Sequence, residues 1–400
     1  MLVRFLVPAN IRHNSGGNVY NARLTQGLRT LGVPVESLAV EGSWPEASAR
    51  ERRRLGGLLG AWDERGDSPQ ADTVTLVDGL IACGAPDELE YAAAAGQHTW
   101  ILQHMPSPNH PDGEGRALRA AAGVICTSSS AAASAAEKHG LPTSRVAFPG
   151  TDPAPVAPGS APPHIIAVAA LLPNKNQLLT VAALARLEDL AWTASLVGTD
   201  DADPAYAARV RAAIASSGLE GRVRVTGQLA GTELADEWNL TDLSLLVSRA
   251  EAFGLVVTES LAHGIPVIVR EGTGAVDALG LAGRLSGRRA RKQDSGRGGE
   301  RGGQIYAVPG AAVGLGETEG DGPGDSGHDD HRADVLASVV RQWLADEPLR
   351  AGWRVAALAA REQLPGWDST ARSVLEILGG FAEETAAEGK PIAAGTAGGQ

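Results

Sequence analysis

The stretch Ser248–Val269, SRAEAFGLVVTESLAHGIPVIV, places two glutamates on an otherwise apolar segment of loop, helix, turn and strand. Glu251 and Glu259 are separated by seven residues. In a helix over Gly254–His263, Glu251, Leu255 and Glu259 follow one face at spacings of i, i+4 and i+8. The opposite face is apolar, which predicts that it packs against a sheet. We therefore expect both carboxylates on the side of the helix mouth and not in the core.

Glycine and proline mark both ends of this predicted helix. Gly254 opens it, and Gly264 followed by Pro266 ends it. A glycine at the start lets a ligand approach the backbone closely, and the unpaired N–H groups of the first turn attract anions. A phosphate-bearing sugar would use both features, with the carboxylates on sugar and ribose hydroxyls. The alternative interpretation is two solvated glutamates on a surface helix.

Composition narrows the class of protein. The chain has 400 residues, which favours two domains, and its 43% hydrophobic and 20% charged residues are ordinary for a globular protein. A net charge of -12 argues against a nucleic-acid partner, which would need a basic face. Cys83 and Cys126 are expected to be buried and reduced. No apolar run approaches a membrane span and the N-terminus looks like a strand, so we expect a cytoplasmic protein.

Short apolar strands alternate with helical patterns along both halves of the chain. This alternation predicts an α/β protein with two doubly wound parallel sheets. The strands expected in the first half are LVRFLV, VPVESLAV, DTVTLVDG, HTWILQHM, GVICTS and SRVAFPG. Those expected in the second half are HIIAVAAL, TASLVG, RVRVTG, DLSLLVS and PVIV, with QIYAVPG as a further candidate.

Changes in composition predict the domain boundaries. The Pro- and Ala-rich segment Thr151–Pro163 has no periodicity and is typical of an interdomain linker. We expect a first domain over 1–155, a linker over 156–163, and a second domain over 164–364. A Gly-rich stretch, first basic and then acidic, predicts a low-complexity insert over 285–330. The remaining predictions are a helix over 365–382 that crosses back to the first domain, and a disordered tail over 383–400.

The segment EAFGLVVTESLAHGIPVIV resembles the donor-site signature of the retaining GT-B glycosyltransferases of family 4, which has a glutamate, seven residues and a second glutamate. Other segments resemble this family in the same order along the chain. They are SGGNVYNARL, ILQHMPSP, VAFPGTD, VAALLPNKNQLL and VRVTGQLAGTELADEW. The resemblance covers roughly 1–282 and 331–380. It implies the GT-B fold, in which the two domains face a central cleft.

The resemblance also implies a role for each residue of the signature. Glu259 would bind the ribose hydroxyls of a nucleoside diphosphate sugar, and Glu251 would lie against the transferred sugar, nearest the reaction. Phe253, Gly254 and Leu255 would offer backbone N–H groups to the donor. Departure of the nucleoside diphosphate would leave negative charge for these groups to stabilise. The acceptor would attack from the face that the leaving group departs, which retains the configuration of the sugar.

Outside the signature, the resemblance implies four more site residues. Lys175 would neutralise the diphosphate, and His104 would contact the sugar from the first domain. Gly16 and Gly17 would let the backbone approach the diphosphate and the acceptor. No cofactor and no metal are implied, since the nucleoside diphosphate sugar is a co-substrate.

The chain departs from the family pattern at Ala170. The family usually has an arginine there, five residues before the lysine, so one of two cations for the diphosphate is missing. Arg12, His13 and Arg249 are candidate replacements. The segment also has Asn176 where glycine is common. These departures keep two alternatives open, namely a GT-B epimerase or phosphorylase, and a degenerate module that only binds a nucleotide sugar.

Two other patterns carry weaker functional signals. Asp201-Ala-Asp203 matches the metal motif of other glycosyltransferases, but the GT-B resemblance implies that no metal is needed. Arg50 and Arg52–Arg54 form a small basic run that is typical of a solvated helix face. The alternative for this run is docking to an anionic membrane or a lipid-linked acceptor.

Overall fold

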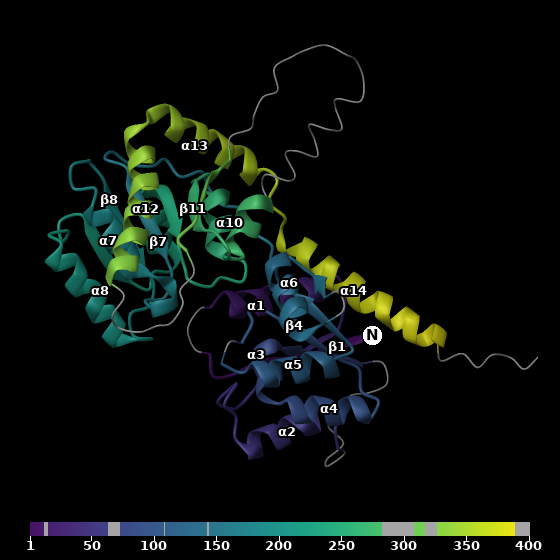
Figure 1. The fold of residues 1–400 in the computed structure, drawn as a ribbon. Coiled ribbons are helices and arrows are strands. Elements are labelled where there is room, and N and C mark those ends of the chain that lie inside the picture. Colours follow the sequence, from purple (N-terminus) through teal and green to yellow (C-terminus); the bar gives the residue numbers. More distant parts are fainter. Residues whose placement is uncertain are drawn as a thin grey trace, which may run out of the picture.

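The computed structural model describes residues 1–11, 15–62, 73–107, 109–141, 144–281, 308–316 and 326–388. Within them the chain forms two six-stranded parallel sheets with helices on both faces, one in each half of the chain (Figure 1). The predicted α/β class with two doubly wound domains is therefore confirmed. Each sheet is parallel because each crossover returns through a helix.

The first sheet has the strand order β2-β1-β3-β4-β5-β6. Its strands are β1 (Leu2–Pro8), β2 (Val35–Val40), β3 (Thr73–Asp78), β4 (Thr99–Gln103), β5 (Gly123–Cys126) and β6 (Arg145–Val146). Its helices are α1 (Gly16–Thr30), α2 (Ala49–Leu59), α3 (Gly79–Gly84), α4 (Pro86–Ala94), α5 (Pro111–Ala120) and α6 (Ser129–His139). β2 and β3 follow each other in the chain but lie on opposite sides of β1. The strand order therefore reverses between β1 and β3.

The second sheet has the order β12-β11-β10-β7-β8-β9. Its strands are β7 (His164–Val168), β8 (Thr193–Val197), β9 (Val223–Gly227), β10 (Thr241–Leu246), β11 (Val267–Arg270) and β12 (Gly310–Val313). Its helical elements are the 3-10 turn η1 (Pro173–Lys175), α7 (Gln177–Ala185), α8 (Pro204–Ser216), α9 (Gly231–Leu240), α10 (Leu255–Ala262), α12 (Ser326–Ala345) and α13 (Glu347–Arg361). Here the order reverses between β7 and β10.

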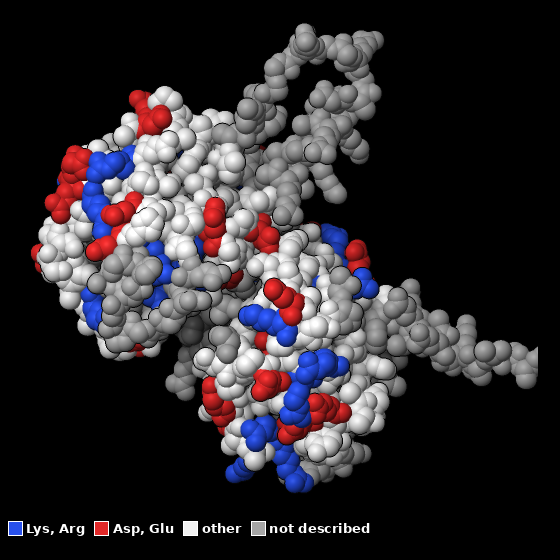
Figure 2. Space-filling view, viewed as in Figure 1, with Lys and Arg blue, Asp and Glu red and all other residues white. Residues whose placement is uncertain are grey.

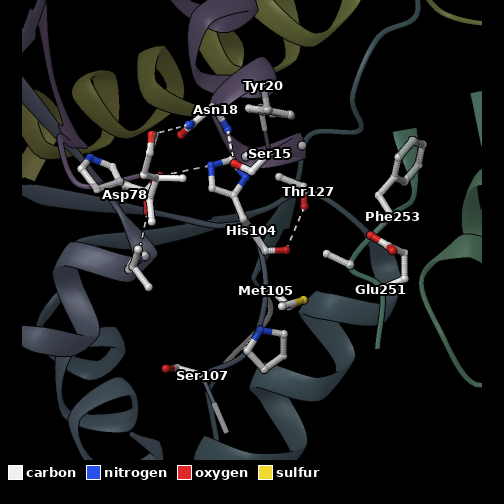
Figure 3. A pocket seen from close by; sticks show the side chains of 18 of the residues that line it. Ser15, Asn18, Tyr20, Asp78, His104, Met105, Ser107, Thr127, Glu251 and Phe253 are labelled. Carbon is white, nitrogen blue, oxygen red and sulfur yellow. Dashed lines mark hydrogen bonds and ion pairs between the residues drawn. The ribbon is translucent and has the colours of Figure 1, made fainter. Parts of the chain in front are cut away.

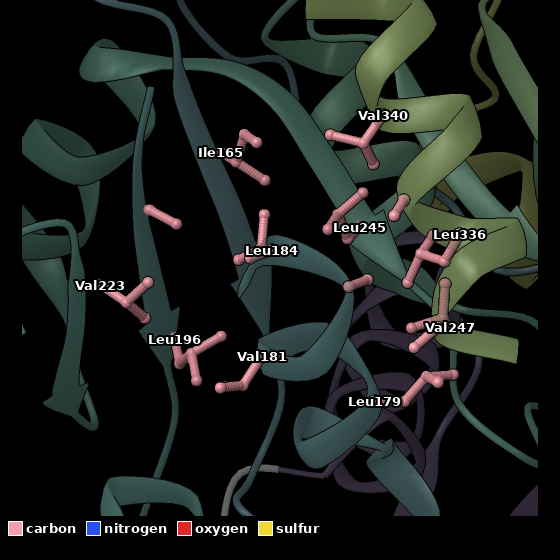
Figure 4. Packing of buried hydrophobic residues seen from close by; sticks show 14 of the residues in the cluster. Ile165, Leu179, Val181, Leu184, Leu196, Val223, Leu245, Val247, Leu336 and Val340 are labelled. Atoms are coloured by element: carbon pink, nitrogen blue, oxygen red, sulfur yellow. The ribbon is translucent and has the colours of Figure 1, made fainter. Parts of the chain in front are cut away.

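Apolar strand residues build the core of each domain. In the second domain Ile165 and Leu245 project from neighbouring strands towards Leu184 of α7 and Leu336 of α12, all almost fully buried (Figure 4). Strands buried on both faces read as continuous apolar runs, which explains why HIIAVAAL and DLSLLVS are predictable as strands.

The last helix, α14 (Trp367–Glu388), leaves the second domain and lies along the first (Figure 1). Its buried Ala371, Val374 and Leu378 join the apolar cluster of β1 and α1. The chain thus crosses between the domains twice, and the two crossings are tied together because Thr151 N–H donates to the Pro365 carbonyl at 2.8 Å.

Two predicted boundaries near the end of the chain are wrong. β12 and the first turn of α12 both fall within the predicted insert over 285–330. The sequence did not predict β12 because its residues, GAAV, are small and carry little strand signal. The expected strand QIYAVPG only reaches β12 at Gly310. Helix α14 extends six residues beyond 382, since Ala and Glu favour helix there. The rest of the insert and tail lie outside the described residues.

Candidate active site

A cavity of about 510 Å³ lies between the two domains. It is lined by the loops that follow β1, β3 and β4 in the first domain and β7 and β10 in the second. These loops include both points where the strand order reverses. In parallel α/β sheets, the carboxyl ends of the strands at such a reversal are where ligands bind. The topology alone therefore identifies this cavity as the candidate active site.

The mouth of α10 forms one wall of the cavity. Gly254 caps the helix with φ of 84°, a left-handed conformation, and an added Cβ would lie 2.7 Å from Leu246 Cδ2. Only glycine fits such a position without strain. The buried ring of Phe253 packs against Phe148 of the first domain, at 6.1 Å between ring centroids. Phe253, Gly254 and Leu255 all line the cavity.

Lys175 and Glu251 meet in this wall. Lys175 Nζ lies 2.8 Å from Glu251 Oε2, and the side chains are 22% and 16% exposed. The supporting loops are pinned together because the N–H of Arg249 donates to the Asn174 carbonyl at 2.7 Å. The N–H of Gly274 donates to the Glu251 carbonyl, also at 2.7 Å. The pair is therefore held on fixed backbone and not on a loose loop.

The departure at Asn176 has a backbone explanation. This residue adopts φ of 64°, the left-handed conformation in which asparagine is the commonest substitute for glycine. Its buried side chain donates from Nδ2 to the Val247 carbonyl at 3.3 Å. Asn176 thus gives the turn after Lys175 the same shape that a glycine would.

The departure at Ala170 leaves the cavity short of positive charge. Ala170 lies just after β7, where its carbonyl accepts from Gln177 Nε2 at 2.9 Å. Among the described residues that line the cavity, Lys175 is the only lysine or arginine. Arg249 is next to a lining loop through its backbone but is not itself a lining residue. Arg12 and His13 lie outside the described residues.

The first turn of α1 forms the facing wall. Gly16 and Gly17 both line the cavity. A Cβ on Gly17 would be 3.3 Å from His104 Cδ2, and one on Gly16 would be 3.6 Å from Leu255 Cδ1 across the domain boundary. Gly17 therefore lets the first turn of α1 lie close against His104, whereas a Cβ on Gly16 would make only an ordinary van der Waals contact with Leu255.

His104 belongs to a buried polar cluster that the sequence did not predict, and Figure 3 shows its contact with Asp78. Its Nε2 lies 2.8 Å from Asn21 Oδ1 and 3.4 Å from Asp78 Oδ2. Asn21 Nδ2 in turn donates to Asp78 Oδ2 at 2.7 Å. Burial raises the pKa of Asp78, but hydrogen bonds from His104, Asn21 and the Leu80 N–H outweigh it and hold that pKa below its usual value. An ionised Asp78 thus orients the imidazole towards the cavity.

Asp78 carries a sequence signal that points to this position. It ends β3 and caps α3, with its Oδ1 accepting the Leu80 N–H at 2.9 Å. An acidic residue at the carboxyl end of a buried strand is recognisable once that strand is placed at the reversal of order. Asn21 gives no comparable signal because it is an ordinary residue within α1.

Glu259 is the one predicted site residue that does not line the cavity. It lies about one turn along α10 from the mouth, and more than a third of its surface is exposed. The surrounding chain still partly buries its carboxylate. This burial, together with the negative charge of Asp152 in the linker, raises the pKa of Glu259 to about 6. Asp152 also pairs with Arg23 of α1.

The residues that resemble metal ligands have other partners. Asp203 caps α8 by accepting the Tyr206 N–H at 2.9 Å, and Asp201 accepts a hydrogen bond from the Thr199 hydroxyl. Within the described part of the chain, no three His, Cys, Asp or Glu side chains are grouped to hold a metal ion. The expectation that the site works without a metal stays a prediction.

The surface carries charges of both signs, side by side on the face shown in Figure 2. Arg50, Arg53 and Arg54 of the basic run are exposed on α2, while Arg52 Nη1 donates to the Ala47 carbonyl at 2.7 Å. Among the described residues, none of the helices combines the length and the apolar composition that a membrane span requires.

Comparison with known sequences finds glycosyltransferases. Residues 151–284 match the model of the family Glycosyl transferases group 1. The chain is 30% identical to the D-inositol 3-phosphate glycosyltransferase of Kineococcus radiotolerans over 176 residues, 44% of this chain and 33% of that protein. It is 31% identical to the mannosylfructose-phosphate synthase of Agrobacterium fabrum over 111 residues, 26% and 24% respectively. The chain therefore matches about a third and about a quarter of the lengths of these curated relatives.

Comparison with solved structures extends the likeness to almost the whole chain. Sucrose-phosphate synthase from Thermosynechococcus elongatus superposes with a TM-score of 0.68 at 18% identity, over 97% of this chain and 100% of that one. HepE of Anabaena, solved with UDP and glucose, superposes with a TM-score of 0.63 at 18% identity, over 95% and 100%. WaaG, a glycosyltransferase of lipopolysaccharide biosynthesis, superposes with a TM-score of 0.60 at 14% identity. The superposition covers 95% of this chain and 100% of WaaG. The fold is therefore the GT-B fold.

Proposed function

We propose that this protein is a retaining glycosyltransferase that moves a sugar from a nucleoside diphosphate sugar to a hydroxyl acceptor. One observation carries the proposal: the Lys175–Glu251 pair lies beside the glycine-capped mouth of α10, in a cavity lined from both strand-order reversals. A cation and free N–H groups suit a diphosphate. A carboxylate next to them suits the sugar that the diphosphate carries. The match of residues 151–284 to a glycosyltransferase family supports the same chemistry.

The second domain would hold the donor. Lys175 and the N–H groups of Phe253, Gly254 and Leu255 would bind the diphosphate and stabilise the charge that develops as it leaves. Glu251 would lie against the transferred sugar. Glu259 would accept hydrogen bonds from the ribose hydroxyls, which requires the donor to extend from the cavity along α10.

The first domain would complete the site when the donor is bound. Gly16 and Gly17 would bring the first turn of α1 against the diphosphate. His104, oriented by Asp78, would contact the sugar from the opposite side. No carboxylate is assigned as a nucleophile, and in the proposed reaction the acceptor attacks from the face that the diphosphate leaves. The absence of a required metal and the cytoplasmic location remain predictions of the same proposal.

Ala170 gives a specific reason to keep a second candidate. With one cation among the described lining residues, the cavity offers less charge to a diphosphate than the family pattern does. A module that binds a nucleotide sugar without transferring it is the corresponding alternative. An epimerase or a phosphorylase on the same fold is distinguished by its products.

The test begins with donor binding and then measures transfer. UDP, GDP and ADP are screened by thermal shift, and a nucleotide at 100 times its dissociation constant should stabilise the protein by roughly 2.7 kcal/mol. Transfer is then followed with the matching nucleotide sugar. Glu251→Ala and Lys175→Ala should each lower the rate by roughly 100-fold or more, while Lys138→Ala, at an exposed lysine of α6, should leave it unchanged. Parent rates in both site variants would refute the proposal, and binding without any turnover would favour the module.

A further inference from the structure

The half of the cavity that the first domain lines carries two carboxylate–imidazole pairs. Asp78 Oδ2 lies 3.4 Å from His104 Nε2, deep in the cavity, with side chains 6% and 19% exposed. Glu46 Oε1 lies 3.0 Å from His110 Nε2 at the mouth, with side chains 68% and 31% exposed. All four residues line the cavity. We call this region, opposite Lys175, the first-domain half.

Both carboxylates are ionised at neutral pH. The pKa of Asp78 lies below its usual value because its hydrogen bonds, including that from His104, outweigh the effect of burial. The hydrogen bond from His110 lowers the pKa of Glu46. No lysine or arginine lines this half among the described residues, a set that excludes 12–14 and 108.

While both carboxylates are ionised, the charge of these four groups cannot become positive. With neutral imidazoles the two carboxylates give a charge of -2, and with both imidazoles protonated the pairs cancel to zero. A phosphate ester placed here would face like charge or no net charge from these four groups. Among the described lining residues the only lysine or arginine is Lys175, which the donor diphosphate already requires. Like charges at short range in a partly enclosed site are unfavourable.

Apolar side chains line the same half. Leu80 at the start of α3 and Ile11 after β1 take part, with Met105 and Pro106 after β4. Met105 is 45% exposed, so the described part of the chain leaves much of its apolar side chain uncovered. A ring face or hydrocarbon portion of a ligand would bury this surface, and an unbranched Met adapts to several shapes.

We propose that the first-domain half selects an acceptor alcohol that carries no phosphate or carboxylate and that has an apolar face. This inference rests on the proposed transferase activity and names the acceptor class. In the reaction, the acceptor oxygen forms a bond to the anomeric carbon as the bond from that carbon to the diphosphate oxygen breaks. The hydroxyl proton leaves with the departing diphosphate. The named relatives include enzymes of phosphorylated acceptors, so the acceptor would differ from theirs.

The test measures binding of matched acceptor pairs by calorimetry, to the full chain saturated with UDP at low ionic strength. The pairs are inositol and inositol 3-phosphate, fructose and fructose 6-phosphate, and glucose and glucose 6-phosphate, and octyl glucoside is measured as a further uncharged member. We expect each uncharged member to bind at least about tenfold tighter than its phosphate. Added salt should shrink this difference, which separates a charge effect from a steric one. Among uncharged members, octyl glucoside should bind tightest.

Charge reversal at the mouth gives the second arm. Glu46→Lys should reduce the preference for uncharged acceptors by roughly tenfold, whereas Glu41→Lys, an equal charge change at an exposed residue outside the cavity, should not. Tighter binding of a phosphate member, a preference that ignores Glu46→Lys, or binding of no uncharged member would overturn the inference. UDP binding, measured first, keeps the two proposals separate. If UDP binds and phosphates are preferred, only the acceptor class is wrong; if none of UDP, GDP and ADP binds, the transferase proposal itself fails.

Discussion

Lys175 and Glu251 form an ion pair of 2.8 Å although 76 positions separate them in the chain. They meet because β7 and β10 are neighbours in the sheet, and each residue lies in the loop that follows one of these strands. Without a ligand, the Glu251 carboxylate therefore pairs with Lys175, the cation that a diphosphate would need. Any anion that binds Lys175 has to share or displace Glu251.

This competition predicts opposite effects of two substitutions on UDP affinity. Glu251→Gln removes the competing charge and should tighten UDP binding by about five- to tenfold, although it should abolish transfer. Lys175→Met should weaken UDP binding by about 10- to 100-fold. Isothermal calorimetry measures both. If Glu251→Gln weakened UDP binding instead, the pair would be a structural feature and not a competitor of the diphosphate.

Glu259 predicts a pH dependence of donor binding. Its pKa is raised to about 6, so the carboxylate that would accept ribose hydrogen bonds is lost as pH falls through 6. UDP-glucose is the suitable ligand because it has no terminal phosphate that titrates near pH 6. The affinity of the parent protein for UDP-glucose should fall below pH 6. The affinity of Glu259→Gln for UDP-glucose should be weak and should not change with pH. Asp152→Asn removes the repelling charge and should move the midpoint to lower pH.

The raised pKa of Glu259 also determines the direction in which the stability of the fold changes with pH. Because the folded-state pKa of Glu259 lies above its usual 4.5, the folded protein holds this proton more tightly, and stability falls as pH rises from about 4.5 to 6. Glu259→Gln should therefore be more stable than the parent at pH 7 and equally stable at pH 4. The solvent-exposed position limits the gain to about 1 kcal/mol or less. Urea titrations at both pH values measure it.

The fold was predictable because its signal is local. Apolar runs such as HIIAVAAL are buried on both faces of a parallel sheet, so they show as strands whatever surrounds them. β12 lacked this signal, since Gly310–Val313 is made of small residues and is a strand only because it pairs with β11. Its placement depends on a tertiary contact that no window of sequence contains.

The same distinction applies to the site: residues in recognisable segments were predictable, whereas contacts between distant segments were not. Gly254 and Lys175 lie in recognisable segments, so their places in the cavity followed from the sequence. The contact of Asn21 with His104 and Asp78 joins three separate elements, α1, the end of β4 and the end of β3. The closeness of Glu259 to Asp152 likewise depends on how the linker runs past α10. Pairs of this kind require the folded chain, because neither partner is unusual in its own segment.

Glu237 predicts an acid-labile contribution to the stability of the second domain. The hydrogen bond from His164 and the charge of Arg224 lower the pKa of this buried carboxylate to about 2. A lowered pKa stabilises the fold above pH 4.5, and this stabilisation is lost as pH falls from about 4.5 towards 2. Glu237→Gln should cost about 3 kcal/mol at pH 7 and little near pH 2. Asp236→Asn, at the exposed preceding residue, is the control.

Gly27 predicts how closely α14 must pack on the first domain. A Cβ on Gly27 of α1 would lie only 2.7 Å from Ala371 Cβ of α14, in a contact between two helix backbones that cannot rotate away. Gly27→Val should therefore separate the helices and cost about 1–3 kcal/mol in unfolding free energy. Gly57→Ala is the matched control, since a Cβ there meets nothing within 4 Å and α2 should gain about 0.5–1 kcal/mol. Equal stability of Gly27→Val and the parent would mean that α14 is not docked on α1 in solution.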